Sequence, residues 1–109
     1  MDDQGKLSLV KTSLGISASD DSYDTDILTY LDMAKEEILN WMYQNHPEML
    51  ETVTEVPRKY SMTQIQAVVN GYSHRGAEGE KIHNENGINR TFQHGDMIAY
   101  IRENVFQLI

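Results

Sequence analysis

Four histidines are the side chains of this sequence best suited to metal binding or acid–base chemistry. They are His46, His74, His83 and His94, and none has the HxxxH or HExxH spacing that places two ligands on one helical face. His83 and His94 could meet across a hairpin, with Asp96 as a third ligand. Hairpin histidines are more often solvent-exposed or hydrogen-bonded, so we predict no metal site.

The other reactive residue types form no catalytic pattern. The absence of cysteine excludes disulfides and thiolate chemistry. Gly76, Gly79 and Gly87 do not form a phosphate-binding loop, which needs a glycine-rich turn followed by lysine and a hydroxyl residue. Most acids fall on expected polar helix faces or in capping segments, where nothing separates the pKa values of two carboxyl groups. We predict no catalytic residue, no cofactor and no enzymatic activity.

Length, composition and charge predict a single globular domain that does not bind nucleic acid. We expect the 109 residues to form one domain, residues 1–109, and the 39% hydrophobic content is typical of a globular fold. The net charge of −8 argues against a nucleic-acid-binding protein, which normally presents a basic patch. The acidic opening and the lack of a long apolar run predict neither a signal peptide nor a membrane span.

Two helices are expected in the N-terminal half. The first carries Leu7, Val10 and Leu14 on one face and has Gly15 where a left-handed residue would end it. Residues 17–22 are rich in hydrogen-bond acceptors that could cap the next helix. This second helix is expected from about residue 23 to 45, before Pro47. Its apolar stripe has spacings of four, three, four and three: Ile27, Leu31, Ala34, Ile38 and Trp41.

A third helix is expected to follow Val56-Pro57, since proline's fixed φ suits a first helical turn. It should run from Arg58 to about His74, and the segment Gly76–Gly79 should break it. Its apolar positions repeat at three and four: Met62, Ile65, Val68, Val69 and Tyr72.

The segment at about residues 80–93 reads as a β-hairpin or extended arm around an Asn-Gly turn. A hairpin is marginal by itself, so it either folds back on its own helices or lays its edge on another chain. The second reading assigns a subunit or partner contact to Ile82, Asn86, Gly87, Ile88, Arg90 and Phe92.

A final helix is expected after Asp96, a plausible N-cap, with Ile98, Ile101, Val105 and Leu108 on one face. The predicted fold is mainly α, a bundle of about four helices with the arm inserted before the last. The predicted core residues are Leu7, Val10, Leu14, Ile27, Leu31, Ala34, Ile38, Trp41, Ile65, Val68, Val69, Ile98, Ile101 and Val105.

The order of these segments resembles the phage head-tail connector family, also described as DNA-packaging adaptor proteins. Four stretches spread over most of the chain carry the resemblance: Leu7–Ile16 (LSLVKTSLGI), Asp26–Trp41, Val56-Pro57, and Gly76–Glu80 (GAEGE) leading into Glu85–Phe92 (ENGINRTF). Glu85-Asn86 departs from the Glu-Gly found in many relatives, and the final helix lacks the usual ending. These departures concern partner details more than the fold.

The resemblance implies a structural subunit that assembles in the host cytoplasm and ends in the virion neck, in a ring of about a dozen copies. Such a ring would bind the portal protein on one side and a stopper or tail-completion protein on the other. DNA would pass through the channel without sequence-specific binding, and acidic walls would keep that contact weak. The alternative is a small acidic helical protein that mimics DNA or inhibits a regulator.

Overall fold

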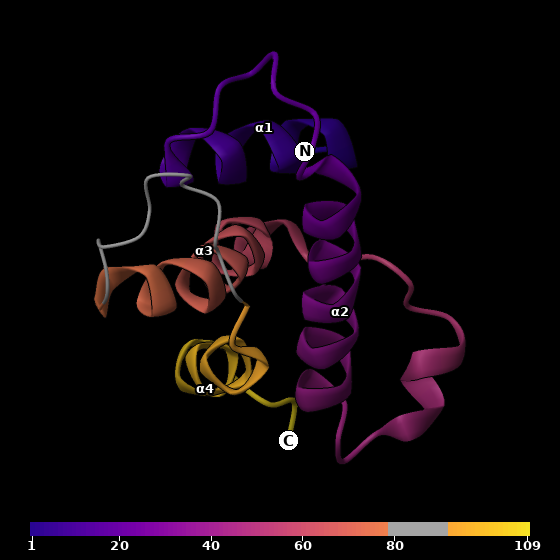
Figure 1. The fold of residues 1–109 in the computed structure, drawn as a ribbon. Coiled ribbons are helices and arrows are strands. Elements are labelled where there is room, and N and C mark those ends of the chain that lie inside the picture. The colour runs from indigo at the N-terminus through magenta and orange to yellow at the C-terminus, as the bar shows by residue number, and fades with distance from the viewer. Residues whose placement is uncertain (79–91) are drawn as a thin grey trace.

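The computed structural model describes the backbone of residues 1–78 and 92–109, and the side chains of residues 1–72 and 92–109. This part of the chain is mainly helical and contains no strand, which confirms the predicted helical bundle (Figure 1). The predicted hairpin falls almost entirely on residues 79–91, outside the described residues, and no strand includes Phe92 or Gln93. The helices are α1 (Asp3–Leu14), α2 (Asp24–Met42), α3 (Ser61–Glu78) and α4 (His94–Asn104), with the 3₁₀ turns η1 (Pro47–Glu51) and η2 (Arg58–Tyr60).

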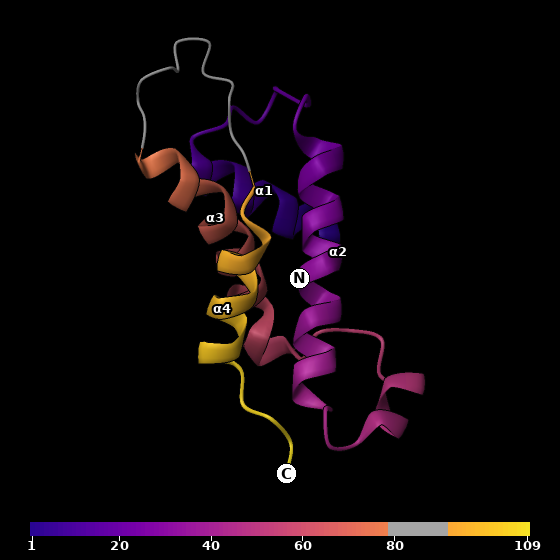
Figure 2. The same ribbon diagram turned by 60° about the horizontal axis from the view of Figure 1, so that its bottom comes forward.

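Helix α3 is at the centre of the packing, since it contacts α1, α2 and α4. Helix α2 packs against α1, α3 and α4, and α1 lies across the end of the bundle where α2 begins (Figure 1). Both views place α4 beside α3, with η1 on the opposite side of α2 (Figure 2). Helix α1 therefore lies at one end of the bundle, and the C-terminus lies at the other end (Figure 1).

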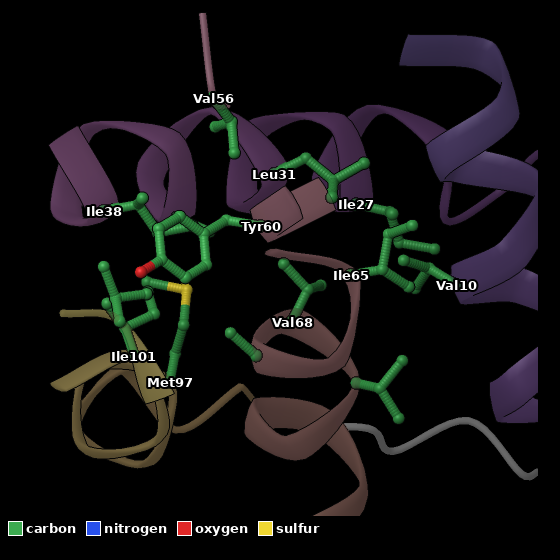
Figure 3. Close-up of a cluster of buried hydrophobic side chains, with 14 of the residues drawn as sticks. Val10, Ile27, Leu31, Ile38, Val56, Tyr60, Ile65, Val68, Met97 and Ile101 are labelled. Carbon is green, nitrogen blue, oxygen red and sulfur yellow. The ribbon is translucent and has the colours of Figure 1, made fainter. Parts of the chain in front are cut away.

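One apolar core joins the helices (Figure 3). Val10 from α1 and Met97 from α4 are both completely buried, and side chains of α2 and α3 lie between these two helices. The residues expected in the core that are buried are Leu7, Val10, Leu14, Ile27, Leu31, Ala34, Ile38, Ile65, Val68, Val69, Ile101 and Val105.

Two expected core residues are not fully buried. Trp41 is half-buried, and its indole N–H donates to the Val105 carbonyl in the chain after α4. Ile98 is also half-buried, and Met97 takes the inward position with Ile101 and Val105. These inward residues are four apart and share one helix face. Ile98 follows Met97 directly, so it points about 100° away from that face. Met62, expected on the apolar face of the third helix, is 57% exposed.

The caps of α1 and α2 differ in kind. Gly15 ends α1 with φ 75°, as expected for a left-handed residue. The N-cap of α2 is Tyr23, which makes no side-chain cap hydrogen bond. The expectation that residues 17–22 cap α2 was therefore wrong: these side chains bond within their own loop. Asp20, for example, accepts bonds from Ser22, which lower the pKa of its carboxyl group.

The later helix bounds also depart from expectation. Helix α3 continues through Gly76 to Glu78, so this glycine does not break it. Helix α4 begins at His94 with Gln93 as N-cap, which places Asp96 in the first turn. It ends at Asn104, and the chain continues in an extended conformation.

No helix in the described part of the chain combines the length and hydropathy needed to cross a membrane.

Candidate functional site

An aromatic cluster fixes the chain where α4 approaches α2 and α3. The ring of Phe92 stacks on Tyr30 with centroids 3.9 Å apart and an interplanar angle of 4°. Tyr72 contacts both rings edge-on, at 5.6 Å from Tyr30 and 5.4 Å from Phe92. The assignment of Phe92 to a partner contact is thus corrected, because its ring packs against the core of its own subunit.

Gly71 makes this arrangement possible. A Cβ atom on Gly71 would lie 2.7 Å from Cζ and 2.9 Å from Cδ1 of Phe92, closer than real side chains approach. The Gly71 carbonyl also accepts a hydrogen bond from the Gln93 amide at 3.0 Å. The Phe92 ring and the backbone of Gln93 therefore both contact Gly71, which has no side chain.

The other predicted contact residues lie outside the described residues: Ile82, Asn86, Gly87, Ile88 and Arg90. Their role stays a prediction. His83, from the metal site considered above, is also outside, and no group of metal-binding side chains occurs within the described residues.

A second fixed feature is the C-terminal tail, which we define as residues 105–109. Trp41 Nε1 donates to the Val105 carbonyl at 2.9 Å, and the Phe106 amide donates to the hydroxyl of Tyr60 at 3.0 Å. The Leu108 amide donates to the Met42 carbonyl at 2.8 Å. These bonds attach the tail to the C-terminal end of α2 and to the turn before α3.

The tail has a fixed backbone but exposed apolar side chains. Phe106 is 82% exposed and Leu108 is 46% exposed. Two cations lie over the aromatic rings that bind the tail: Arg102 over Trp41 at 5.0 Å and Lys59 over Tyr60 at 5.2 Å. This end of the molecule exposes Phe106 and Arg102, and aromatic and arginine side chains are enriched in protein interfaces.

The α1 end has exposed acidic side chains. Both lysines of α1 are buried: Lys6 Nζ donates to Gln64 Oε1 at 2.6 Å, and Lys11 Nζ lies 2.8 Å from Asp24 Oδ1. Lys11 also donates to the Ala18 carbonyl at 3.3 Å, which ties the acidic loop to α1. The charged residues exposed on α1 and in this loop are therefore all acidic.

Sequence reasoning missed the tail and the buried lysines. Val105 continues the apolar spacing of α4, and nothing in that spacing predicts that the helix ends at Asn104. Lysine is rarely buried, so Lys6 and Lys11 read as solvent-facing residues. Their partners on α2 and α3 are distant in sequence and become apparent only in the folded chain.

A comparison with known protein families completes this description. The family model described as "Phage gp6-like head-tail connector protein" matches residues 5–104, which include α2, α3, α4 and all but the first two residues of α1. No curated protein and no solved structure matches the chain. The match covers far more than half of the chain and agrees with the resemblance found in the sequence. The chain therefore belongs to the phage gp6-like head-tail connector family.

Proposed function

We propose that the chain is a structural subunit of a ring in the virion neck, below the portal protein. The ring would hold about a dozen copies, joined by one face of each subunit against a different face of the next. Portal protein would contact one side and a stopper or tail-completion protein the other. The observation that carries this proposal is the family match over residues 5–104.

The surface of the described residues supports an assembling protein. Phe106 and Leu108 are exposed on a backbone that is already held by hydrogen bonds, so docking would require little further ordering of the tail. The net charge of −8 also suits a channel past which DNA slides, because a wall rich in Lys and Arg would retain phosphates.

Co-sedimentation with the portal ring of the same phage tests the proposal. We expect stoichiometric binding, because a connector must dock on the portal. The variant Ile88→Ser should weaken binding if the predicted arm meets a partner. Phe92 also belongs to the predicted arm, but it is not substituted here, because its loss would disturb the core. The matched control is Leu50→Ser, a half-buried apolar residue of η1.

A parent chain that stays in the supernatant at low and moderate salt would refute portal docking. The acidic inhibitor would then be the better description, and capture of a DNA-binding protein in competition with DNA would support it. Equal losses in Ile88→Ser and Leu50→Ser would instead show that destabilisation, not contact, explains the result.

A further inference from the structure

The exposed basic side chains of the described surface lie at one end of the bundle. Of the nine basic residues in the sequence, three fall within residues 73–91, Lys6 and Lys11 are buried, and Lys35 is half-buried. The three exposed cations that remain are Arg58, Lys59 and Arg102, on η2 and α4. Lys59 and Arg102 each lie over a ring that binds the tail, so the exposed positive charge gathers beside the tail.

We define the tail end as these three cations together with Phe106 and Leu108. Two exposed acids accompany these cations in the sequence: Glu103 follows Arg102, and Glu55 precedes Arg58 by three residues. Charge alone would therefore bind a partner weakly at this surface. The large exposed side chain of Phe106 supplies apolar area that a partner could bury. A suitable partner would carry acidic groups beside an apolar residue.

The chain itself presents such a surface at its other end, which we define as the acidic end. Its charged residues are exposed at the start of α1 and in the following loop, and Leu9 of α1 is 36% exposed. Figure 1 shows α1 and this loop at the opposite end of the molecule from the C-terminus. The acidic end comprises Asp2, Asp3, Asp20, Asp21 and Leu9.

We propose that the tail end of one copy docks on the acidic end of the next copy. This inference rests on the proposed ring, which needs two different and complementary faces on each subunit. Exposed ion pairs contribute little individually, so burial of Phe106 and Leu108 provides most of the affinity and the charges set the orientation. Because the two surfaces are at opposite ends, one copy can bind a neighbour at each end.

Intermolecular paramagnetic relaxation enhancement detects such a contact even when it is weak. The chain lacks cysteine, so Glu103→Cys provides one site for a nitroxide at the tail end. This labelled copy is mixed at millimolar concentration with a ¹⁵N-labelled parent copy. We expect broadening of the amide signals of Asp20, Asp21 and Leu9. Absence of broadening, or broadening confined to other surfaces, overturns the proposal.

Charge variants test the specificity of the contact. Arg58→Gln with Lys59→Gln in the labelled copy should reduce the broadening about two- to fivefold, as expected for the loss of two exposed ion pairs. Thr25→Glu with Gln66→Glu is the matched control: it lowers the net charge equally, at exposed positions of α2 and α3 outside the segments that bind the tail. An equal reduction in the control would attribute the effect to net charge and overturn the docking surface.

The two proposals can fail separately. Broadening at the acidic end without portal binding would leave the head-to-tail contact standing and remove the connector role. Portal binding without broadening would leave the connector role and remove this contact. Broadening that disappears when duplex DNA is added would identify the tail end as a DNA contact, contrary to the proposal.

Discussion

Gly71 illustrates how a single hydrogen atom determines the packing of a neighbouring element. A methyl group at this position would overlap the ring of Phe92, whose face is already stacked on Tyr30. The ring cannot move aside without giving up that stack and its edge contact with Tyr72. Gly71 is therefore a packing requirement of the site where α4 joins the bundle.

We predict that Gly71→Ala destabilises the fold by about 1–3 kcal/mol, the usual cost of overpacking. Urea unfolding followed by circular dichroism measures the change. Gly95→Ala is the control, because nothing lies within 4 Å of its added Cβ and alanine favours the helix. Equal stability of the two variants would show that Phe92 does not rest on Gly71 in solution.

Lys6 and Gln64 form a polar link in an otherwise apolar interior. Lys6 Nζ donates to the Gln64 side-chain oxygen, and Gln64 Nε2 donates to the Leu31 carbonyl at 2.8 Å. One amide thus connects α1, α3 and α2. Removal of the amide would leave a buried ammonium group without this acceptor, which is costly.

We predict that Gln64→Leu lowers the free energy of unfolding by about 2–4 kcal/mol, the range for breaking a buried polar pair at one partner. The double variant Lys6→Met with Gln64→Leu should recover most of the loss, because the charge is removed as well. Thermal and urea unfolding of the four forms of this double-mutant cycle give the coupling. Additive losses would contradict the proposed link.

At the scale of elements, the C-terminal tail is distinctive because it is held by side chains from other helices. Trp41 and Tyr60 bind consecutive residues of the tail, at the Val105 carbonyl and the Phe106 amide. These two side chains belong to α2 and η2, so the tail links segments that are distant in sequence.

We predict that Tyr60→Phe speeds amide hydrogen exchange at Phe106 about three- to tenfold, because a hydrogen bond contributes about 1 kcal/mol. The aromatic ring and its packing remain, so exchange at Met97 and Ile101 should stay unchanged. A uniform acceleration across α4 would show that the substitution weakens the whole fold and not the tail alone.

At the scale of the whole molecule, the burial of two lysines makes the surface more acidic than the composition alone indicates. Lys6 and Lys11 are satisfied internally, by an amide and by Asp24. Exposed positive charge in the described part of the chain is then confined to the tail end, with half-buried Lys35 on α2. The basic side chains that remain exposed are therefore unevenly distributed over the described surface.

We predict that the isolated chain does not shift duplex DNA in gel electrophoresis at about 50 mM salt, a condition in which basic proteins bind phosphate strongly. The charge variant Asp20→Lys with Asp21→Lys provides a comparison with added basic groups in an exposed loop. Binding by the parent that falls steeply with salt would contradict the proposed weak contact between channel wall and DNA.

The sequence by itself determined the helical class, the order of the helices and most of the core. These features depend on local spacing: Ile27, Leu31, Ala34 and Ile38 can share a face only if the chain is helical. The sequence also identified the family through the order of short segments, which the family match confirms. The single-domain organisation and the roles of Ile82 and Ile88 stay predictions.

The tertiary structure decided the features that depend on partners far along the chain. Phe92 packs inward because Gly71 and Tyr30 provide a surface for its ring, and neither residue is near it in sequence. Helix α4 ends at Asn104, and the tail that follows forms hydrogen bonds with the side chains of Trp41 and Tyr60. A further turn of α4 would not make these bonds. Periodicity contains no information about such distant donors and acceptors, so only the folded chain reveals where the tail lies and which charges remain exposed.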